Sequence, residues 1–264
     1  MSEIGMSTSC FYPIETEKSL EKVCNLGFKT VEMFINSYLE LEEPFITVYK
    51  RLKDEYNINI VSVHTTASFA DGYNYFSDYY RRFEESLEMF KKHLELANVL
   101  NSKFLVMHGI KKQMRSSDEL YFERFGILCD LAKANGISLL QENVVHFRSE
   151  SPDYIERMKK YIGDSFGITL DIKQCRRAGV DPYDFIELHH DIIKHIHISD
   201  YNDECDCITP LKGLFDFERF FRRLSDLKYN GDYMIELYKN SYKEASEIKE
   251  SAIKLEEILK YIKN

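Results

Sequence analysis

Six apolar runs in this chain each end at a histidine or a carboxylate, and no other feature of the sequence constrains the fold as strongly. The runs are IVSVH, FLVMH, ISLLQE, FGITLD, IKHIH and YMIE, which end at His64, His108, Glu142, Asp171, His197 and Glu236. Short apolar runs of this kind are typical of strands buried in a parallel sheet. In a parallel barrel, the carboxyl ends of all strands meet at one rim. We therefore expect these six polar side chains to converge there.

Two further apolar runs raise the number of expected strands to eight. The segments between the strands are charged and carry apolar residues at helical spacing, as in Glu17–Leu26, Asp78–Leu100 and Lys243–Ile262. Strands that alternate with helices predict a parallel sheet, and eight such units in about 250 residues predict a closed (β/α)₈ TIM barrel of the α/β class. We expect residues 1–264 to form a single domain of this kind. Its strands are predicted at Ile4–Ser9, Thr30–Phe34, Ile58–His64, Lys103–His108, Ile137–Glu142, Gly167–Asp171, Ile192–Ser199 and Tyr233–Leu237.

The composition limits the classes of partner. With 35 Lys and Arg against 44 Asp and Glu, the formal net charge is −9. Such a charge disfavours nucleic-acid binding, because a phosphate backbone is held mainly by basic surface. No apolar stretch approaches the roughly 18–20 residues of a membrane span, and the first residues lack the pattern of a signal peptide. We therefore expect a cytoplasmic protein with neither nucleic-acid nor membrane partners.

The strand ends also predict a metal site. Side chains two residues apart on a strand share a face, so Glu142, Asp171, His197 and Glu236 can each point into the barrel mouth, with His195 one layer deeper. Several unpaired carboxylates buried at one point would be costly, and a divalent cation removes that cost. Carboxylate and imidazole ligands suit Mn²⁺, Zn²⁺, Co²⁺ or Fe²⁺. We expect one of these ions as the cofactor and no organic cofactor.

The order of these residues along the chain resembles a known group, the xylose-isomerase-like TIM barrel superfamily. The resemblance rests on His64, His108, Glu142-Asn143, Asp171, His197-x-x-Asp200 and Glu236, and it spans the whole chain. The group includes sugar and sugar-phosphate isomerases and epimerases, inosose dehydratases and the apurinic endonucleases. By this resemblance, Glu142, Asp171, His197 and Glu236 form the shared metal site. His64 and His108 would then lie beside it, as ligands of a second metal or as substrate contacts.

The chain departs from the endonuclease members of this group at several positions. Those members carry a histidine three residues after the aspartate of the sixth strand, where this chain has Gln174. They also carry an aspartate and a histidine in the loop after the seventh strand, where this chain has Cys205 and Cys207. A further metal site made of oxygen and imidazole ligands is therefore largely missing, which argues against DNA repair.

Other polar residues near the strand ends are candidates for substrate contacts. Glu32, at the end of the second strand, is expected to orient hydroxyl groups. Lys173 and Lys212 stand out among basic residues in the loops after the strands, which would suit a phosphate or carboxylate, although such loops are commonly basic because they are exposed. The full set of expected substrate-binding residues is Glu32, Asn143, Lys173, Gln174, Asp200 and Lys212.

The sequence therefore favours a metal-dependent sugar or sugar-phosphate isomerase or epimerase that works through a metal-stabilised enediolate. As the resemblance to the epimerases implies, Glu142 and Glu236 would be the catalytic pair that moves the proton from opposite faces. One departure concerns Asp203, which stands where several ketose epimerases carry an arginine. The expected partner is a small sugar or sugar phosphate, and association with copies of the same chain is expected from the resemblance.

Three alternatives remain open from the sequence. The same carboxylates could dehydrate a cyclic polyol in the manner of an inosose dehydratase. A second metal at His64, His108 and Glu142 could support phosphodiester hydrolysis of the apurinic endonuclease type. A barrel that binds sugar without catalysis is the fourth hypothesis, and it would be expected to lack one of the metal ligands.

Overall fold

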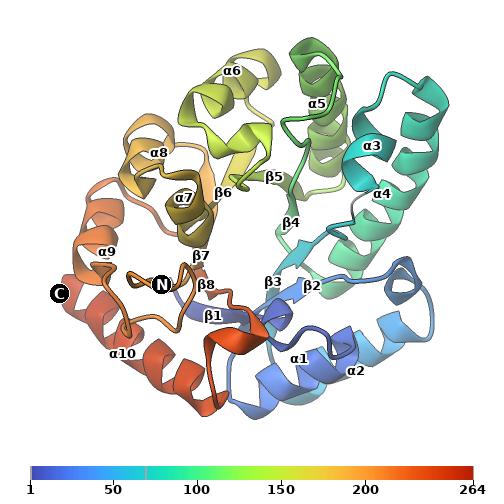
Figure 1. Cartoon of the computed structure of the whole chain (residues 1–264). Coiled ribbons are helices and arrows are strands. Elements are labelled where there is room, and N and C mark those ends of the chain that lie inside the picture. Colours follow the sequence, from blue (N-terminus) through green and yellow to red (C-terminus); the bar gives the residue numbers. More distant parts are fainter. Residues whose placement is uncertain (1, 69, 264) are drawn as a thin grey trace.

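Eight parallel strands form a closed barrel in this computed structural model, which describes residues 2–68 and 70–263. Each strand pairs with the next along the chain, and the last pairs with the first (Figure 1). The strands are β1 (Ile4–Ser7), β2 (Thr30–Phe34), β3 (Asn59–His64), β4 (Phe104–Met107), β5 (Ser138–Glu142), β6 (Gly167–Asp171), β7 (Ile193–Ile198) and β8 (Tyr233–Ile235). This arrangement confirms the predicted TIM barrel.

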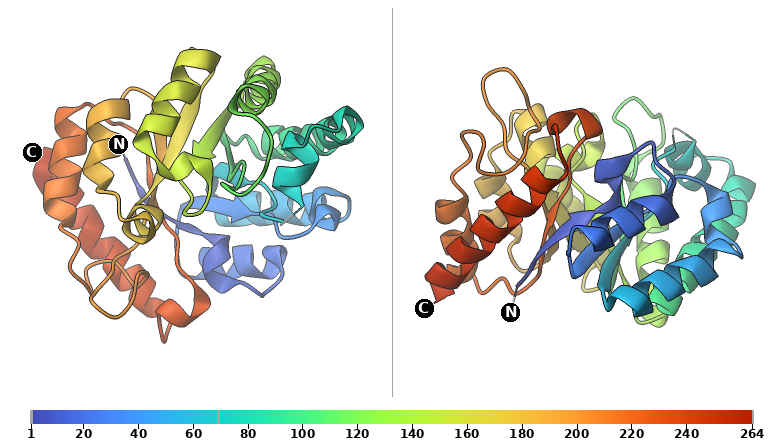
Figure 2. Two further views of the ribbon diagram at one scale, coloured as in Figure 1. Left: turned by 45° about the horizontal axis from the view of Figure 1, so that its top comes forward. Right: turned by 90° about the horizontal axis from the view of Figure 1, so that it is seen from below.

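Helices surround the barrel on its outside, as the views from further sides show (Figure 2). They are α1 (Thr16–Asn25), α2 (Phe45–Tyr56), α3 (Asp71–Phe76), α4 (Tyr80–Leu100), α5 (Asp118–Ala134), α6 (Pro152–Ile162), α7 (Ile172–Ala178), α8 (Pro182–His189), α9 (Phe217–Asp226) and α10 (Ser246–Lys263). Short 3₁₀ turns follow four of the strands, at Thr8–Phe11, Tyr38–Leu41, Arg148–Glu150 and Lys239–Ser241. Within the described ranges, no helix is both long and apolar enough to cross a membrane.

Local sequence signals explain where several helices begin. The Asp181 carboxylate accepts a hydrogen bond from the Tyr183 amide, and Pro182 occupies the first position of α8, which is the favoured arrangement for a helix start. Helix α7 begins directly at the end of β6, and Asp171 is its N-cap. This cap uses only one carboxylate oxygen of Asp171, and the other oxygen stays available to the barrel mouth.

The strand register sets the relative positions of the predicted site residues along the barrel. Asp171 on β6 lies opposite His197 on β7, and Glu142 on β5 lies opposite Thr169. Since a strand alternates its side chains between two faces, a residue two positions earlier occupies the layer below. Thr169 and His195 are paired in that lower layer. The barrel interior is therefore polar over two successive layers.

Candidate metal centre

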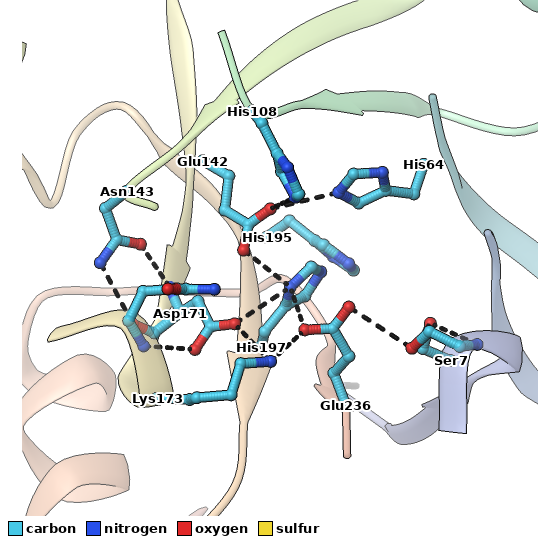
Figure 3. A network of polar contacts seen from close by, with 12 residues as sticks. Ser7, His64, His108, Glu142, Asn143, Asp171, Lys173, His195, His197 and Glu236 are labelled. Carbon is cyan, nitrogen blue, oxygen red and sulfur yellow. Dashed lines mark hydrogen bonds and ion pairs between the residues drawn. The ribbon is translucent and has the colours of Figure 1, made fainter. Parts of the chain in front are cut away.

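Four side chains from consecutive strands surround one point at the carboxyl end of the barrel (Figure 3). The Nδ1 atom of His197 lies 3.8 Å from Glu142 Oε1, 3.8 Å from Asp171 Oδ2 and 3.5 Å from Glu236 Oε2. All four residues are buried, and one ligand atom from each lies within 4.8 Å of the others. The structure thus brings together the four residues predicted as metal ligands.

The donor atoms fit a divalent cation. His197 Nδ1 is buried and makes no hydrogen bond, although three carboxylates face it. A buried polar atom without a partner is costly unless something else satisfies it. Three carboxylate oxygens and one imidazole nitrogen form a ligand set that suits Mn²⁺, Fe²⁺, Co²⁺ or Zn²⁺. The four residues would therefore hold such an ion.

Lys173 reaches into the same point from the first turn of α7. Its Nζ lies 2.6 Å from Glu236 Oε2 and 3.2 Å from Asp171 Oδ2, and its side chain is only 3% exposed. Burial lowers the pKa of Lys173, but the charges of Asp171 and Glu236 outweigh burial and hold this pKa well above its ordinary value. The sequence pattern identified Lys173 as a substrate contact. The structure shows in addition that its ammonium is paired with two of the metal-ligand carboxylates.

Two further histidines flank Glu142 on the other side of the centre. The Nε2 atoms of His64 and His108 each lie 3.2 Å from Glu142 Oε2. His64 is fully buried, donates from Nδ1 to the Thr65 carbonyl oxygen at 2.7 Å and stacks on Phe34, whereas His108 is 25% exposed. Burial opposes ionisation of Glu142, but these histidines and His197 outweigh it and hold the pKa of Glu142 well below its usual range. His64, His108 and Glu142 form a second group that could hold an ion.

The side-chain amides of Asn143 and Gln174, near the candidate centre, make different kinds of contact. Asn143 Oδ1 accepts from the Asp171 amide at 2.6 Å, and its Nδ2 donates to the Asp171 carbonyl oxygen at 3.1 Å. Asn143 therefore holds the end of β6 beside that of β5, and its contact with substrate stays a prediction. Gln174 Oε1 accepts from the Val145 amide at 3.1 Å, and Gln174 also lines the cavity described below.

Asp200 makes structural contacts in this structure, and its contact with substrate stays a prediction. It is fully buried, and its two carboxylate oxygens accept hydrogen bonds at 2.8–2.9 Å from the amides of Tyr201, Gly213 and Phe215. A Cβ atom on Gly213 would lie 2.5 Å from Asp200 Oδ1, so only glycine allows this close approach. Asp200 therefore anchors the loop after β7. Lys212 in the same loop is exposed, and its role in binding an anion stays a prediction.

Glu32 lies below the centre rather than at its mouth. Strand β2 continues to Phe34, so Glu32 lies in the middle of the strand, where it is fully buried. Its Oε2 lies 3.1 Å from His197 Nε2 and 3.0 Å from His195 Nε2, and it accepts a hydrogen bond from Ser62 Oγ at 2.8 Å. The contact between Glu32 and substrate hydroxyls stays a prediction. The sequence reasoning missed this network, although the alternation of His195 and His197 on one strand face was a signal for it.

A cavity of about 310 Å³ adjoins the centre at the barrel mouth. Its wall combines apolar residues from the loops after β4 and β5 with polar groups near the ligands. Arg177 donates to the Tyr238 hydroxyl at 2.7 Å on one side of this cavity. The lining includes Thr65, His108, Phe147, Gln174, Arg177 and Tyr238.

Residues 20–258 match the Xylose isomerase-like TIM barrel family, and the chain belongs to this family. Its relatives include an uncharacterised protein of Methanocaldococcus jannaschii, which is 29% identical over 248 residues that cover 89% of this chain and 83% of the relative. Another, from Mycobacterium leprae, is 20% identical over 93% of this chain and 92% of its own. These matches confirm the superfamily that the sequence resembles.

Several solved structures share the fold. A D-tagatose 3-epimerase-like protein superposes with a TM-score of 0.78 at 24% identity, covering 98% of this chain and 96% of its own. An L-ribulose 3-epimerase gives 0.80 at 15% identity, with 100% and 96% coverage. A probable 3-DHS dehydratase of Bacillus anthracis gives 0.73 at 15% identity, with 100% and 99% coverage. These neighbours establish the fold, within which sugar epimerases are frequent.

Proposed function

We propose that this protein is a divalent-metal-dependent isomerase or epimerase of a sugar or sugar phosphate. The observation that carries the proposal is the placement of two glutamates around one imidazole nitrogen. Glu142 comes from the end of β5 and Glu236 follows β8, and their carboxylates lie 3.8 Å and 3.5 Å from His197 Nδ1. Two carboxylates that approach one point from different strands can serve the two faces of a substrate carbon.

A divalent cation held by Glu142, Asp171, His197 and Glu236 would polarise the carbonyl and hydroxyl oxygens of a ketose or aldose and make the intervening C–H more acidic. The chain's own residues then hold and move the proton. Glu142 is supported by hydrogen bonds with His64 and His108, and Glu236 by Lys173 and by Ser9, whose Oγ lies 3.4 Å from Glu236 Oε1. Besides His197, which both glutamates share, each glutamate thus has its own set of partners, which gives the two carboxylates different chemical environments.

In the metal-free protein, both carboxylates are held in the ionised form, which can accept a proton. Burial raises the pKa of Glu236, but Lys173 and His197 outweigh burial and hold this pKa below its ordinary value. The pKa of Glu142 is lowered in the same way by its histidine neighbours. An ionised carboxylate can remove a proton from the carbon on one face and pass it to solvent, while its counterpart takes up a proton from solvent and delivers it to the carbon on the other face.

The cavity beside the centre supports a substrate of monosaccharide size. It opens next to His108 and Gln174, so a bound chain would extend from the proposed cation toward Phe147 and Tyr238. Aromatic side chains present flat apolar surfaces of the kind that sugar rings contact. Arg177, which lines the same cavity, supplies a cation for a phosphate or carboxylate on the far end of the substrate.

Elemental analysis and solvent exchange together test the proposal. Protein purified without chelator should contain about one Mn, Fe, Co or Zn per chain. In deuterated water, the enzyme should catalyse incorporation of deuterium at the carbon next to the carbonyl of its ketose substrates. NMR of the sugar measures this incorporation. Absence of any metal, even after addition of Mn²⁺ or Zn²⁺, would overturn the proposal. Glu218→Gln, an exposed position on α9 paired with Arg222, provides the control variant.

Phosphodiester hydrolysis is the second candidate, because His64, His108 and Glu142 form an adjacent group that could hold another ion. Two such ions would clamp the attacking and leaving oxygens of a phosphate ester. A content of two metal ions per chain, with cleavage of an abasic DNA strand, would favour hydrolysis. One ion per chain and deuterium incorporation into ketoses would favour the isomerase.

A further inference from the structure

A carboxylate lies directly beneath the candidate metal centre, on the opposite side of the His197 ring. Glu32 Oε2 is 3.1 Å from His197 Nε2, while His197 Nδ1 faces the three carboxylates above at 3.5–3.8 Å. The two ring nitrogens of His197 therefore face two different acidic environments. Both side chains are almost completely buried, at 0% exposure for Glu32 and 1% for His197.

The chemistry of Glu32 decides which nitrogen carries the proton when His197 is a neutral ligand. A carboxylate only accepts hydrogen bonds, so the nitrogen that faces Glu32 must be the donor. The lone pair of neutral His197 is then on Nδ1, which is the atom that faces Glu142, Asp171 and Glu236. Glu32 thus selects the tautomer in which the free nitrogen points at the cation.

Glu32 is itself fixed by two other groups. Ser62 Oγ donates to the same Oε2 at 2.8 Å, and His195 Nε2 lies 3.0 Å from it. These contacts come from β3 and β7, so Glu32 is fixed from two sides of the barrel.

We propose that Glu32 is a positioning residue, which orients the His197 ring from below and presents its Nδ1 to the metal. The inference rests on the proposed function, since a cation at the four-ligand point is the group that His197 would bind. Figure 3 shows His197 among Glu142, Asp171 and Glu236 with His195 beside it, and the two imidazole rings lie edge to face with their centroids 5.2 Å apart. Outer partners of metal-bound histidines typically change metal affinity by 10–100-fold when they are removed.

Three variants test the proposal. Glu32→Met removes the acceptor at similar size, Glu32→Gln keeps the shape and one acceptor but loses the charge, and Ser62→Ala removes another donor from the same oxygen without touching His197. Metal affinity is measured by competition with a fluorescent chelator, using Mn²⁺ and Zn²⁺. We expect Glu32→Met to bind about 10–100-fold more weakly, Glu32→Gln to lie between it and the wild type, and Ser62→Ala to stay within about twofold of the wild type.

Crystal structures of the metal-free variants provide a readout that needs neither metal nor activity. In Glu32→Met, the His197 ring should turn or move so that Nδ1 no longer faces the three carboxylates, while in Ser62→Ala it should stay in place. An unmoved ring in Glu32→Met would overturn the inference even if the wild type binds metal. If the wild type binds no divalent cation, the proposed function fails, and these structures still decide the role of Glu32.

Two further outcomes keep the test decisive. If Glu32→Met fails to fold, the Glu32→Gln variant decides the test. A metal affinity of Glu32→Gln equal to that of Ser62→Ala would then overturn the proposal. Glu32, His195 and His197 also lie close enough to hold an ion themselves. Two ions per wild-type chain, with one lost in His195→Ala, would assign Glu32 as a ligand and overturn the positioning role.

Discussion

Lys173 Nζ lies 2.6 Å from Glu236 Oε2, which makes a buried ion pair inside the group of four candidate metal ligands. The ammonium also lies 3.2 Å from Asp171 Oδ2. In the absence of a metal, Lys173 is thus the cation that balances part of the charge of three buried carboxylates. A divalent ion bound at this point would contact Asp171 and Glu236, the two carboxylates that pair with Lys173.

Replacing Lys173 tests this relationship. Lys173→Met should destabilise the metal-free protein by about 3–5 kcal/mol, because it leaves buried carboxylates without a partner. It should also tighten the binding of Mn²⁺ or Zn²⁺, since a neighbouring positive charge is gone. Thermal unfolding with and without metal measures both effects, and the rise in Tm on adding metal should be larger than in the wild type.

The control for this variant is Lys212→Met, which removes the same charge from an exposed loop position. Lys212→Met should change neither stability nor metal affinity measurably. Weaker metal binding by Lys173→Met would show that the lysine organises the ligands rather than competing with the ion.

The two proposed proton carriers should be indispensable. Glu142→Ala and Glu236→Ala should each remove both metal and activity, because each glutamate is proposed to bind the ion and to move the proton. General acid–base groups contribute typically 10²–10⁴-fold to a rate, and loss of the ion adds to this. Elemental analysis and the deuterium-exchange assay measure the two losses separately. Full metal content in either variant would contradict the ligand assignment.

His195 should behave differently from His197. His195→Ala should cost about 2–5 kcal/mol of stability, the range for truncating a large buried side chain, because His195 lies in the layer below the ligands. Urea unfolding measures this cost, and metal content should be largely retained, whereas His197→Ala should lose the ion. A folded His195→Ala protein without metal would contradict the layer assigned to His195.

The metal-free protein should lose stability as the pH rises above about 6.5, the ordinary pKa of histidine. In the fold, burial lowers the pKa of His64 but Glu142 outweighs burial, and the charges of Glu32 and Glu236 likewise raise the pKa of His197. A histidine whose pKa is raised on folding contributes its full stability below the unfolded value and loses it as the pH rises through the folded value. Urea unfolding in chelator at pH 6 and pH 8.5 should show the decrease.

Metal binding should show the opposite pH dependence. The imidazole of His197 must give up its Nδ1 proton to bind a cation, so affinity should rise with pH and binding should release protons. Calorimetry in two buffers of different ionisation enthalpy measures the released protons. Affinity that is constant from pH 6 to pH 8.5 would argue against His197 as a ligand.

The sequence alone determined the fold and the rim at which the candidate site lies. Eight apolar runs separated by helical segments predict a closed parallel barrel, and six of these runs end at a histidine or a carboxylate. Strand parity then predicted that Glu142, Asp171, His197 and Glu236 point inward, because alternation along a strand is a local property of the backbone. The same parity also placed His195 below His197.

Only the tertiary structure decided which polar residues near the strand ends face the mouth and which hold the scaffold. Asn143 and Asp200 lie near the candidate ligands in the sequence, yet Asn143 bonds to backbone groups of β6 and Asp200 bonds to backbone amides of its own loop after β7. Glu32 was expected at the barrel mouth. Two residues of β2 follow it, however, and its side chain lies under His197. The contact between Glu32 and His197 joins residues 165 positions apart, and that between Asn143 and Asp171 joins two different strands. Their distances depend on barrel register and loop packing, which no local pattern encodes.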